Sequence, residues 1–430
     1  MARRNYLVEM QHVLLWGVFA GMLEGSVSSI VVAKTFHAGP WLITLVMAAP
    51  MFANLMGLVW GFLATGRRKL PLFMAFAVAC VALIASVAFT PDSPAGGWVF
   101  AGQIVVANLL LSGCVTVRAS LWKHNYPMTS RGRITARLQG VRFLLGIATV
   151  SVAALLFDWN PDVYRFAYPA TALLGAVGLL VLRRMHVRGE DLELKTIAER
   201  AVGRGPASLS PLALWRGMWD ILRADRPYAQ YCLAMMLLGI ANMMITPIMT
   251  IIVTKQLYLS YYHSTNLMDV APRIFLMGSL MPWAELFDRG GVVRFRVINA
   301  WVWTAVTLAG GIGATIIARW GVDEILPFTL AVTFVALARV ASGLGEGGGA
   351  IAWNIGHLHF AAPEKAEVYM GAHVFLTGLR GMFAPFLGTF LYTSCGPIAF
   401  AVAFASATAG SIIFWHLARA ERRDRARQET

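Results

Sequence analysis

The sequence predicts an all-α integral membrane protein with twelve transmembrane helices arranged as two six-helix bundles. Of its 430 residues, 58% are hydrophobic and only 13% are charged, whereas a soluble domain carries about 25% charged residues. Apolar runs long enough to cross a bilayer, which takes about 20 residues, recur along the whole chain. One long polar connection separates these runs into two sets of six. Together these features exclude a water-soluble globule.

The spans and their connections define the predicted domains. The apolar runs of the first half lie near residues 10–34, 40–64, 70–90, 97–123, 137–158 and 166–183. Those of the second half lie near residues 228–254, 261–286, 292–318, 326–358, 367–393 and 396–418. We therefore predict an N-terminal bundle at 1–183, a cytoplasmic linker at 184–226, a C-terminal bundle at 227–420 and a cytoplasmic basic tail at 421–430.

The linker contains a short amphipathic pattern. Its large apolar side chains recur at helical spacing, at Leu212, Trp215, Trp219 and Leu222. This spacing predicts a short helix that lies in the membrane interface. A surface helix packed on the cytoplasmic ends of the bundle is the alternative.

The net charge of +14, from 36 basic and 22 acidic residues, would suggest nucleic-acid binding in a soluble protein. Here most basic residues fall at both termini, in the linker and in the even-numbered connections between spans. By the positive-inside rule, both termini and the linker are cytoplasmic, and no nucleic-acid partner is expected. The composition is rich in Arg, Ala and Gly, which is typical of a GC-rich bacterial genome, so we expect a bacterial plasma (inner) membrane.

Charged residues inside the spans are the most informative feature, because each is costly unless it faces a wet cavity or a partner. They occur only in the first, fourth, fifth, eighth, tenth and eleventh spans, at Glu24, Arg118, Arg142, Asp269, Arg273, Arg339, Glu346 and Arg380. This distribution predicts a central cavity. Counted from the span ends, Glu24, Arg273, Arg339 and Arg380 lie near the midplane. Arg118 and Arg142 lie close to the cytoplasmic ends, where they are expected to snorkel or pair at the inner mouth.

The residue types in this set suggest roles. A carboxylate in a low-dielectric cavity has its neutral form favoured, so Glu24 is the candidate proton carrier. The alternative is a permanent ion pair between Glu24 and one of the arginines. Five arginines against three acids leave the set net positive, and guanidinium groups match carboxylate or phosphate oxygens, which favours an organic anion as the substrate. No metal-ligand spacing and no phosphate-binding loop for ATP is present, so we expect neither metal nor cofactor.

Three stretches carry a resemblance to a known family. Residues 61–69 read Gly-Phe-Leu-Ala-Thr-Gly-Arg-Arg-Lys, residues 284–291 read Ala-Glu-Leu-Phe-Asp-Arg-Gly-Gly, and residues 339–346 contain Arg-x-x-x-Gly-x-x-Glu. With the two sets of six spans, these stretches resemble the major facilitator superfamily. Thr65 stands where that family has an acid.

The resemblance implies two bundles related by a pseudo-two-fold repeat, with the substrate cavity between them and alternating access as the mechanism. It also implies a gating loop formed by Gly61, Arg67, Arg68, Asp288 and Arg289. In the family's arrangement, Asp288 would meet the N-terminal end of a helix of the opposite half. The glycines at 345–349 would allow close helix packing and bending.

We therefore predict a secondary active transporter, not an enzyme, that moves a small solute with protons as the coupling ion. An organic anion is the favoured solute, and the chain is expected to act as a monomer in the bilayer. Two alternatives remain open: a multidrug or cation efflux permease, and a transport-inactive sensor or assembly factor with the same fold. An intramembrane enzyme is disfavoured because the acids are dispersed along the spans.

Overall fold

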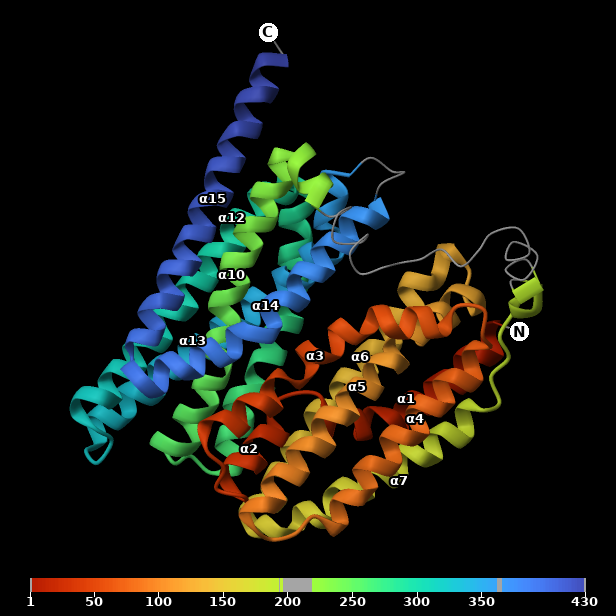
Figure 1. Cartoon of the computed structure of the whole chain (residues 1–430), viewed down its shortest axis with the longest axis horizontal. Helices are drawn as coiled ribbons and strands as arrows, with labels where there is room; N and C mark the ends of the chain where they lie inside the picture. The colour runs from red at the N-terminus through yellow and green to blue at the C-terminus, as the bar shows by residue number, and fades with distance from the viewer. Residues whose placement is uncertain (1, 193, 196–218, 362–365, 429–430) are drawn as a thin grey trace. The chain divides into compact units, whose positions relative to one another are not determined.

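The computed structural model describes residues 2–192, 194–195, 219–361 and 366–428, and all regular structure among them is helical (Figure 1). The predicted all-α membrane fold class is confirmed. The helices form two compact units. Unit 1 holds α1 to α7 together with the short α11, and unit 2 holds α10 and α12 to α15.

Unit 1 is built from six apolar spans. Its helices are α1 (Ala2–Leu23), α2 (Val27–Lys34), α3 (Pro40–Ala64), α4 (Lys69–Ala85), α5 (Pro94–Asn125), α6 (Met128–Trp159), α7 (Tyr164–Leu182) and α11 (Tyr261–Thr265). Helix α1 packs against both α6 and α7, and α5 packs against α3 and α4. Segment α11, which is distant in sequence, packs on α6 and α2. The carboxylate of Asp158 at the end of α6 accepts hydrogen bonds from the backbone N–H groups of Tyr261 (2.6 Å) and Tyr262 (2.9 Å).

The first span is broken, although the sequence predicted one uninterrupted run. Helix α1 ends at Leu23 and α2 begins at Val27. Gly25 between them has φ = 125°, a conformation that glycine adopts far more readily than other residues. Two serines satisfy carbonyl groups at the break: Ser28 donates to the carbonyl of Met22 (3.1 Å), and Ser29 donates to that of Ser26 (2.6 Å). Glu24 therefore lies in a non-helical turn inside the span.

Unit 2 contains the other six spans. Its helices are α10 (Arg226–Ile251), α12 (Ala271–Trp320), α13 (Ile325–Ile355), α14 (Ala366–Cys395) and α15 (Ile398–Gln428), with short π-helices at Ile252–Gln256 and Asn266–Val270. A straight helix of the 50 residues of α12 would measure about 75 Å, far more than the roughly 30 Å of a bilayer core. The backbone leaves helical geometry at Gly291 (φ 69°, ψ 171°). The predicted spans 261–286 and 292–318 therefore remain two helices.

Eleven apolar helical runs among the described residues are long enough to cross a membrane, and the run Tyr261–Trp320 spans 60 residues and contains this break. Two further predicted segments are the basic tail and the interfacial helix of the linker. Helix α15 continues to Gln428, so the predicted tail is helical through that residue. Most of the predicted interfacial helix lies outside the described residues, and only 219–224 is seen, as helix.

Glycines let α13 pack closely against α12. A Cβ added at Gly343 would lie 2.3 Å from the carbonyl oxygen of Pro272, and one at Gly347 would lie 2.2 Å from the Ser279 hydroxyl. A Cβ at Gly349 would meet nothing within 4 Å. The predicted close packing is therefore seen at particular glycines of this helix and not at all of them.

This packing gives a stability prediction. We expect Gly343→Ala to lower the free energy of unfolding by about 1–3 kcal/mol, because the new methyl group collides with backbone. The control Gly349→Ala should be neutral or slightly stabilising, because alanine favours a helix over glycine by about 1 kcal/mol. Thermal unfolding of the purified variants in detergent measures both. Equal midpoints for the two variants would contradict the close contact.

Candidate solute-binding site

An ion pair joins the broken first span to α6. The guanidinium of Arg142 donates from Nη1 to Oε1 of Glu24, and the two side chains are 10% and 30% exposed. Arg142 also donates from Nε to Oε1 of Gln139 (2.9 Å), and its guanidinium lies 5.2 Å from the ring centre of Phe143. Arg142 is therefore contacted by Glu24, Gln139 and Phe143, and the Glu24 side chain is only partly buried.

Helix α6 begins before the predicted span of residues 137–158. Helix α6 begins at Met128, so Arg142 is 14 residues into the helix, or about 21 Å along its axis. The prediction placed it at the inner mouth because the span was counted from the start of the apolar run near residue 137. The polar residues before that point are helical as well, and the depth of Arg142 in the membrane stays a prediction.

Arg118 joins the same cluster. It lies on α5, seven residues before the helix ends at Asn125, and its guanidinium is 5.1 Å from the ring centre of Trp122. It interacts electrostatically with Arg142, Glu24 and Glu9. The two arginines and two glutamates balance the charge of this cluster.

Glu9 is a member of this cluster that the sequence analysis missed. It is only 4% exposed, and its carboxylate accepts hydrogen bonds from the indole N–H of Trp122 and the hydroxyl of Tyr126. The predicted span began at residue 10, so Glu9 was counted as a flanking residue. Helix α1 begins at Ala2, which places Glu9 within it.

Unit 2 gathers four of the predicted cavity residues where α12 and α13 meet. Arg273 Nε lies 2.9 Å from Asp269 Oδ1, at a spacing of four residues. Arg339 Nη2 donates to the carbonyl of Met268 (2.8 Å), and Glu346 interacts electrostatically with Arg339, Asp269 and Arg273. Asp269 belongs to the π-helix Asn266–Val270, and such single π-turns occur frequently at functional sites.

Arg380, the remaining predicted cavity residue, lies beside a second buried arginine. Its Nη1 donates to the carbonyl of Met235, and its guanidinium lies so close to Gly239 that an added Cβ would be 2.2 Å from the Arg380 Cζ. Arg380 interacts electrostatically with Arg296. The two residues are 6% and 1% exposed, so two positive charges are buried near each other.

Arg296 lies within the predicted span 292–318 but was not counted among the charges inside the spans. The second helical part of α12 begins directly after Gly291, so Arg296 is already inside the helix. It donates to the Tyr231 hydroxyl (3.4 Å) and to Asn299 Oδ1 (3.2 Å). Within the part of the chain that the structure describes, neither Arg296 Nη2 nor Arg380 Nε has a hydrogen-bond acceptor, and no carboxylate pairs with either residue.

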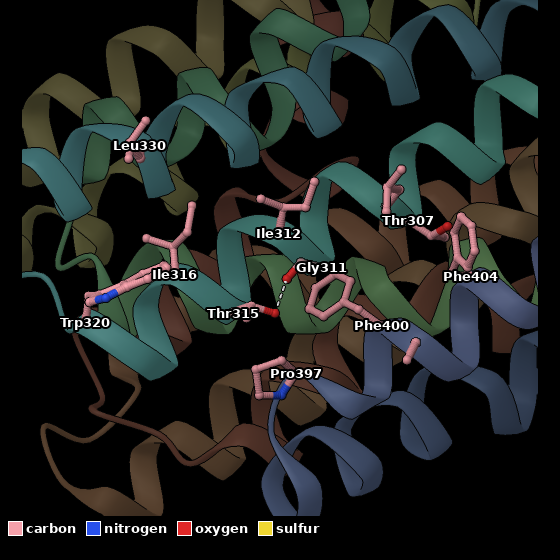
Figure 2. A pocket seen from close by; sticks show the side chains of 12 residues that line it. Thr307, Gly311, Ile312, Thr315, Ile316, Trp320, Leu330, Pro397, Phe400 and Phe404 are labelled. Carbon is pink, nitrogen blue, oxygen red and sulfur yellow. Dashed lines mark hydrogen bonds between the residues drawn. The ribbon is translucent and has the colours of Figure 1, made fainter.

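A separate apolar cavity of about 570 Å³ lies in unit 2 between α12, α13 and α15. Figure 2 shows Ile312, Trp320 and Phe400 around it, with the Thr315 hydroxyl turned back to donate to the carbonyl of Gly311 (2.7 Å). Its lining includes no charged side chain. The predicted cavity charges lie elsewhere, and a charged solute would lose its hydration here without gaining a partner.

The comparisons with known proteins concern the fold. No protein-family model matches the sequence, and no curated protein is significantly similar to it.

Solved structures do match. The inward-open xylose transporter XylE from E. coli has a TM-score of 0.61 at 12% identity, over 96% of both chains. A POT family transporter in complex with a thioalcohol-conjugated peptide has a TM-score of 0.63 at 12% identity, over 98% of this chain and 96% of that chain. The nucleoside transporter NupG has a TM-score of 0.60 at 14% identity, over 97% of this chain and 99% of that chain.

The chain has the major facilitator superfamily fold. Its predicted gating loop can be located on that fold. Gly61 lies near the end of α3, and Arg67 and Arg68 follow in the turn at Gly66 (φ 68°). Arg68 pairs with Asp191 (3.1 Å).

The segment after α7 provides a further contact to this loop, because Glu190 Oε1 accepts a hydrogen bond from the backbone N–H of Lys69 (2.5 Å). Glu190 and Asp191 thus supply negative charge next to the loop that contains Thr65. Sequence alone gave no signal for this, because the partners are more than 120 positions apart.

The second half of the predicted gating loop lies in α12 just before Gly291. Arg289 forms an exposed ion pair with Glu285 (3.5 Å) at a spacing of four residues, and Asp288 is also exposed. Exposed pairs of this kind contribute little stability. The expected contact between Asp288 and a helix of the other half stays a prediction.

Proposed function

We propose that the protein is a secondary active transporter that moves a small organic anion across the bacterial plasma membrane by alternating access, with protons as the coupling ion. The ion pair between Glu24 and Arg142 carries the proposal, because it places a titratable carboxylate at a break in a membrane span. The fold supports the proposal: solved structures that it resembles include a D-xylose-proton symporter, with a TM-score of 0.64 at 13% identity over 95% of this chain and 96% of that chain.

The pair suggests how protons and solute are coupled. A proton and the Arg142 guanidinium compete for the Glu24 carboxylate, because the protonated acid is neutral and no longer forms an ion pair. Protonation would therefore release Arg142 to bind an anionic group of the solute. Loss of the proton would restore the pair and displace the solute. This exchange makes solute binding depend on protonation, which is the requirement for symport.

The arginines without carboxylate partners support an anionic solute. Glu24 forms an ion pair with Arg142, and Asp269 forms one with Arg273. The Glu9 carboxylate accepts hydrogen bonds from Trp122 and Tyr126. Among the described residues, Arg296 and Arg380 have no carboxylate partner and are left as excess positive charge inside unit 2. A cation carrier would instead need a carboxylate available to its substrate, so the efflux alternative gains no support from these contacts.

The topology also remains a proposal. Both termini and the connection between the two units are basic, so we place them on the cytoplasmic side. We also propose that the transporting unit is the monomer, with the bilayer and the solute as its only obligatory partners.

Ligand-dependent stability of the purified protein tests the solute class. A thermal-unfolding screen with organic anions, sugars and cationic drugs should raise the midpoint only for anions, because a ligand that binds the native state stabilises it. Stabilisation by cationic drugs alone would overturn the anion assignment and favour the efflux alternative.

A further inference from the structure

A basic depression lies at the end of unit 1 where α5 ends and α6 begins. Its volume is about 570 Å³, and it is lined by Lys123, His124, Tyr126, Pro127, Arg131, Arg188 and Gly189. Lys123, Arg131 and Arg188 carry a positive charge at neutral pH, and none of the lining residues is acidic. All of its lining residues belong to unit 1, and Tyr126 connects it to Glu9 of the cluster around Glu24.

The walls of this depression are fixed by hydrogen bonds. Arg131 donates to the carbonyls of Lys123 (2.9 Å) and Tyr126 (3.1 Å), so its guanidinium is fastened to the end of α5. The backbone N–H of Arg188 donates to Oδ1 of Asn125 (3.2 Å), and the Asn5 side chain donates to the carbonyl of His186 (2.7 Å). The segment that carries Arg188 is thereby attached to both α1 and α5.

Among the described residues, no ion pair neutralises the basic side chains of the depression. Lys123 and Arg188 form no ion pair within the described part of the chain, and Arg131 Nη1 has no hydrogen bond there. The two acidic residues that follow Arg188 and Gly189 in sequence have other partners. Glu190 accepts a hydrogen bond from the backbone N–H of Lys69, and Asp191 forms an ion pair with Arg68.

The start of α6 adds to this positive field. The helix follows Pro127 with no side-chain cap and no acidic residue in its first turn. Its first backbone N–H groups carry partial positive charge that favours an anion. The depression therefore brings together the start of a helix, two arginines and a lysine. Groups of these kinds commonly donate hydrogen bonds to phosphate oxygens.

We propose that this depression is a phosphate-binding site, in which Lys123, Arg131 and Arg188 hold the oxygens of a phosphate group. Lys123 supplies a point charge on a flexible stem, and Arg131 and Arg188 supply planar donors. The same chemistry is offered by the headgroup of an anionic phospholipid and by a soluble phosphate. Basic residues that only set the membrane topology would not bind phosphate in preference to chloride at the same ionic strength.

The test uses the purified full-length protein in a neutral detergent, with thermal unfolding as the readout. One arm titrates inorganic phosphate against chloride at constant ionic strength. The other titrates short-chain phosphatidylglycerol against short-chain phosphatidylcholine. Stabilisation in the first arm identifies a soluble phosphate site, and stabilisation only by phosphatidylglycerol identifies a lipid headgroup site.

Variants of single basic residues show whether phosphate binds in this depression. Lys123→Gln and Arg188→Gln should each weaken the apparent affinity about tenfold, because each removes a charge-assisted contact. The matched control is Arg133→Gln, an exposed basic residue in the first turns of α6 that does not line the depression. It should change the affinity less than about twofold, as expected for a screened surface charge. No stabilisation in either arm, or an equal loss in the Arg133→Gln control, would overturn the proposal.

Discussion

Replacing Glu24 by Gln should abolish accumulation of the solute driven by a pH gradient while leaving exchange of solute across the membrane. Gln has nearly the shape of Glu but cannot take up and release a proton, so it removes the competition for Arg142. The ratio of internal to external solute should fall to about 1, because a carrier without coupling only equilibrates its solute. Uptake and counterflow in vesicles that contain the purified variant measure the two activities.

A double variant separates coupling from folding. Glu24→Gln alone leaves Arg142 without its counter-charge, which should lower stability by about 1–2 kcal/mol, less than for a fully buried pair because the Glu24 side chain is 30% exposed. Adding Arg142→Gln should restore most of that stability but not the accumulation. Normal accumulation by Glu24→Gln would show that the pair is a permanent structural contact, the alternative left open by the sequence.

Replacing Arg380 by Gln should weaken anion binding about tenfold with little loss of stability. The Arg380 guanidinium has no carboxylate partner within the described residues and interacts unfavourably with Arg296. Its removal relieves that repulsion but also removes one charge-assisted contact for an anion, which is typically worth a factor of about ten. The concentration of anion that gives half of the maximal thermal stabilisation measures this effect.

Arg273→Gln is the matched contrast. It removes the ion-pair partner of Asp269, which is 5% exposed, so it should cost about 3–5 kcal/mol of stability. The account of Arg380 would be wrong if Arg380→Gln bound the anion with unchanged affinity. It would also be wrong if that variant were as unstable as Arg273→Gln.

The sequence predicts the spans of this protein better than their ends. Apolar runs identify each span because the bilayer sets a minimum length. Polar residues at the ends of the runs continue the helices, and hydropathy does not show where they stop. For this reason Glu9, which lies inside α1, was left out of the first predicted span.

The pairing of the charges is predictable only where it is local. The ion pair between Asp269 and Arg273 follows from a spacing of four residues, which places both on one helix face. Glu24 and Arg142 are 118 positions apart, so no pattern in a single sequence could join them. The break at Gly25 also had no decisive signal, because a glycine inside an apolar run is common in membrane helices.

Uptake of a labelled organic anion into vesicles that contain the purified protein tests the central claim most directly. The anion is chosen by its thermal stabilisation of the protein, and the vesicle interior is made alkaline relative to the outside. We predict accumulation above the external concentration, which a protonophore abolishes and which Glu24→Gln vesicles lack. Uptake that is the same with and without the pH gradient, for every anion that stabilises the protein, would contradict proton-coupled transport.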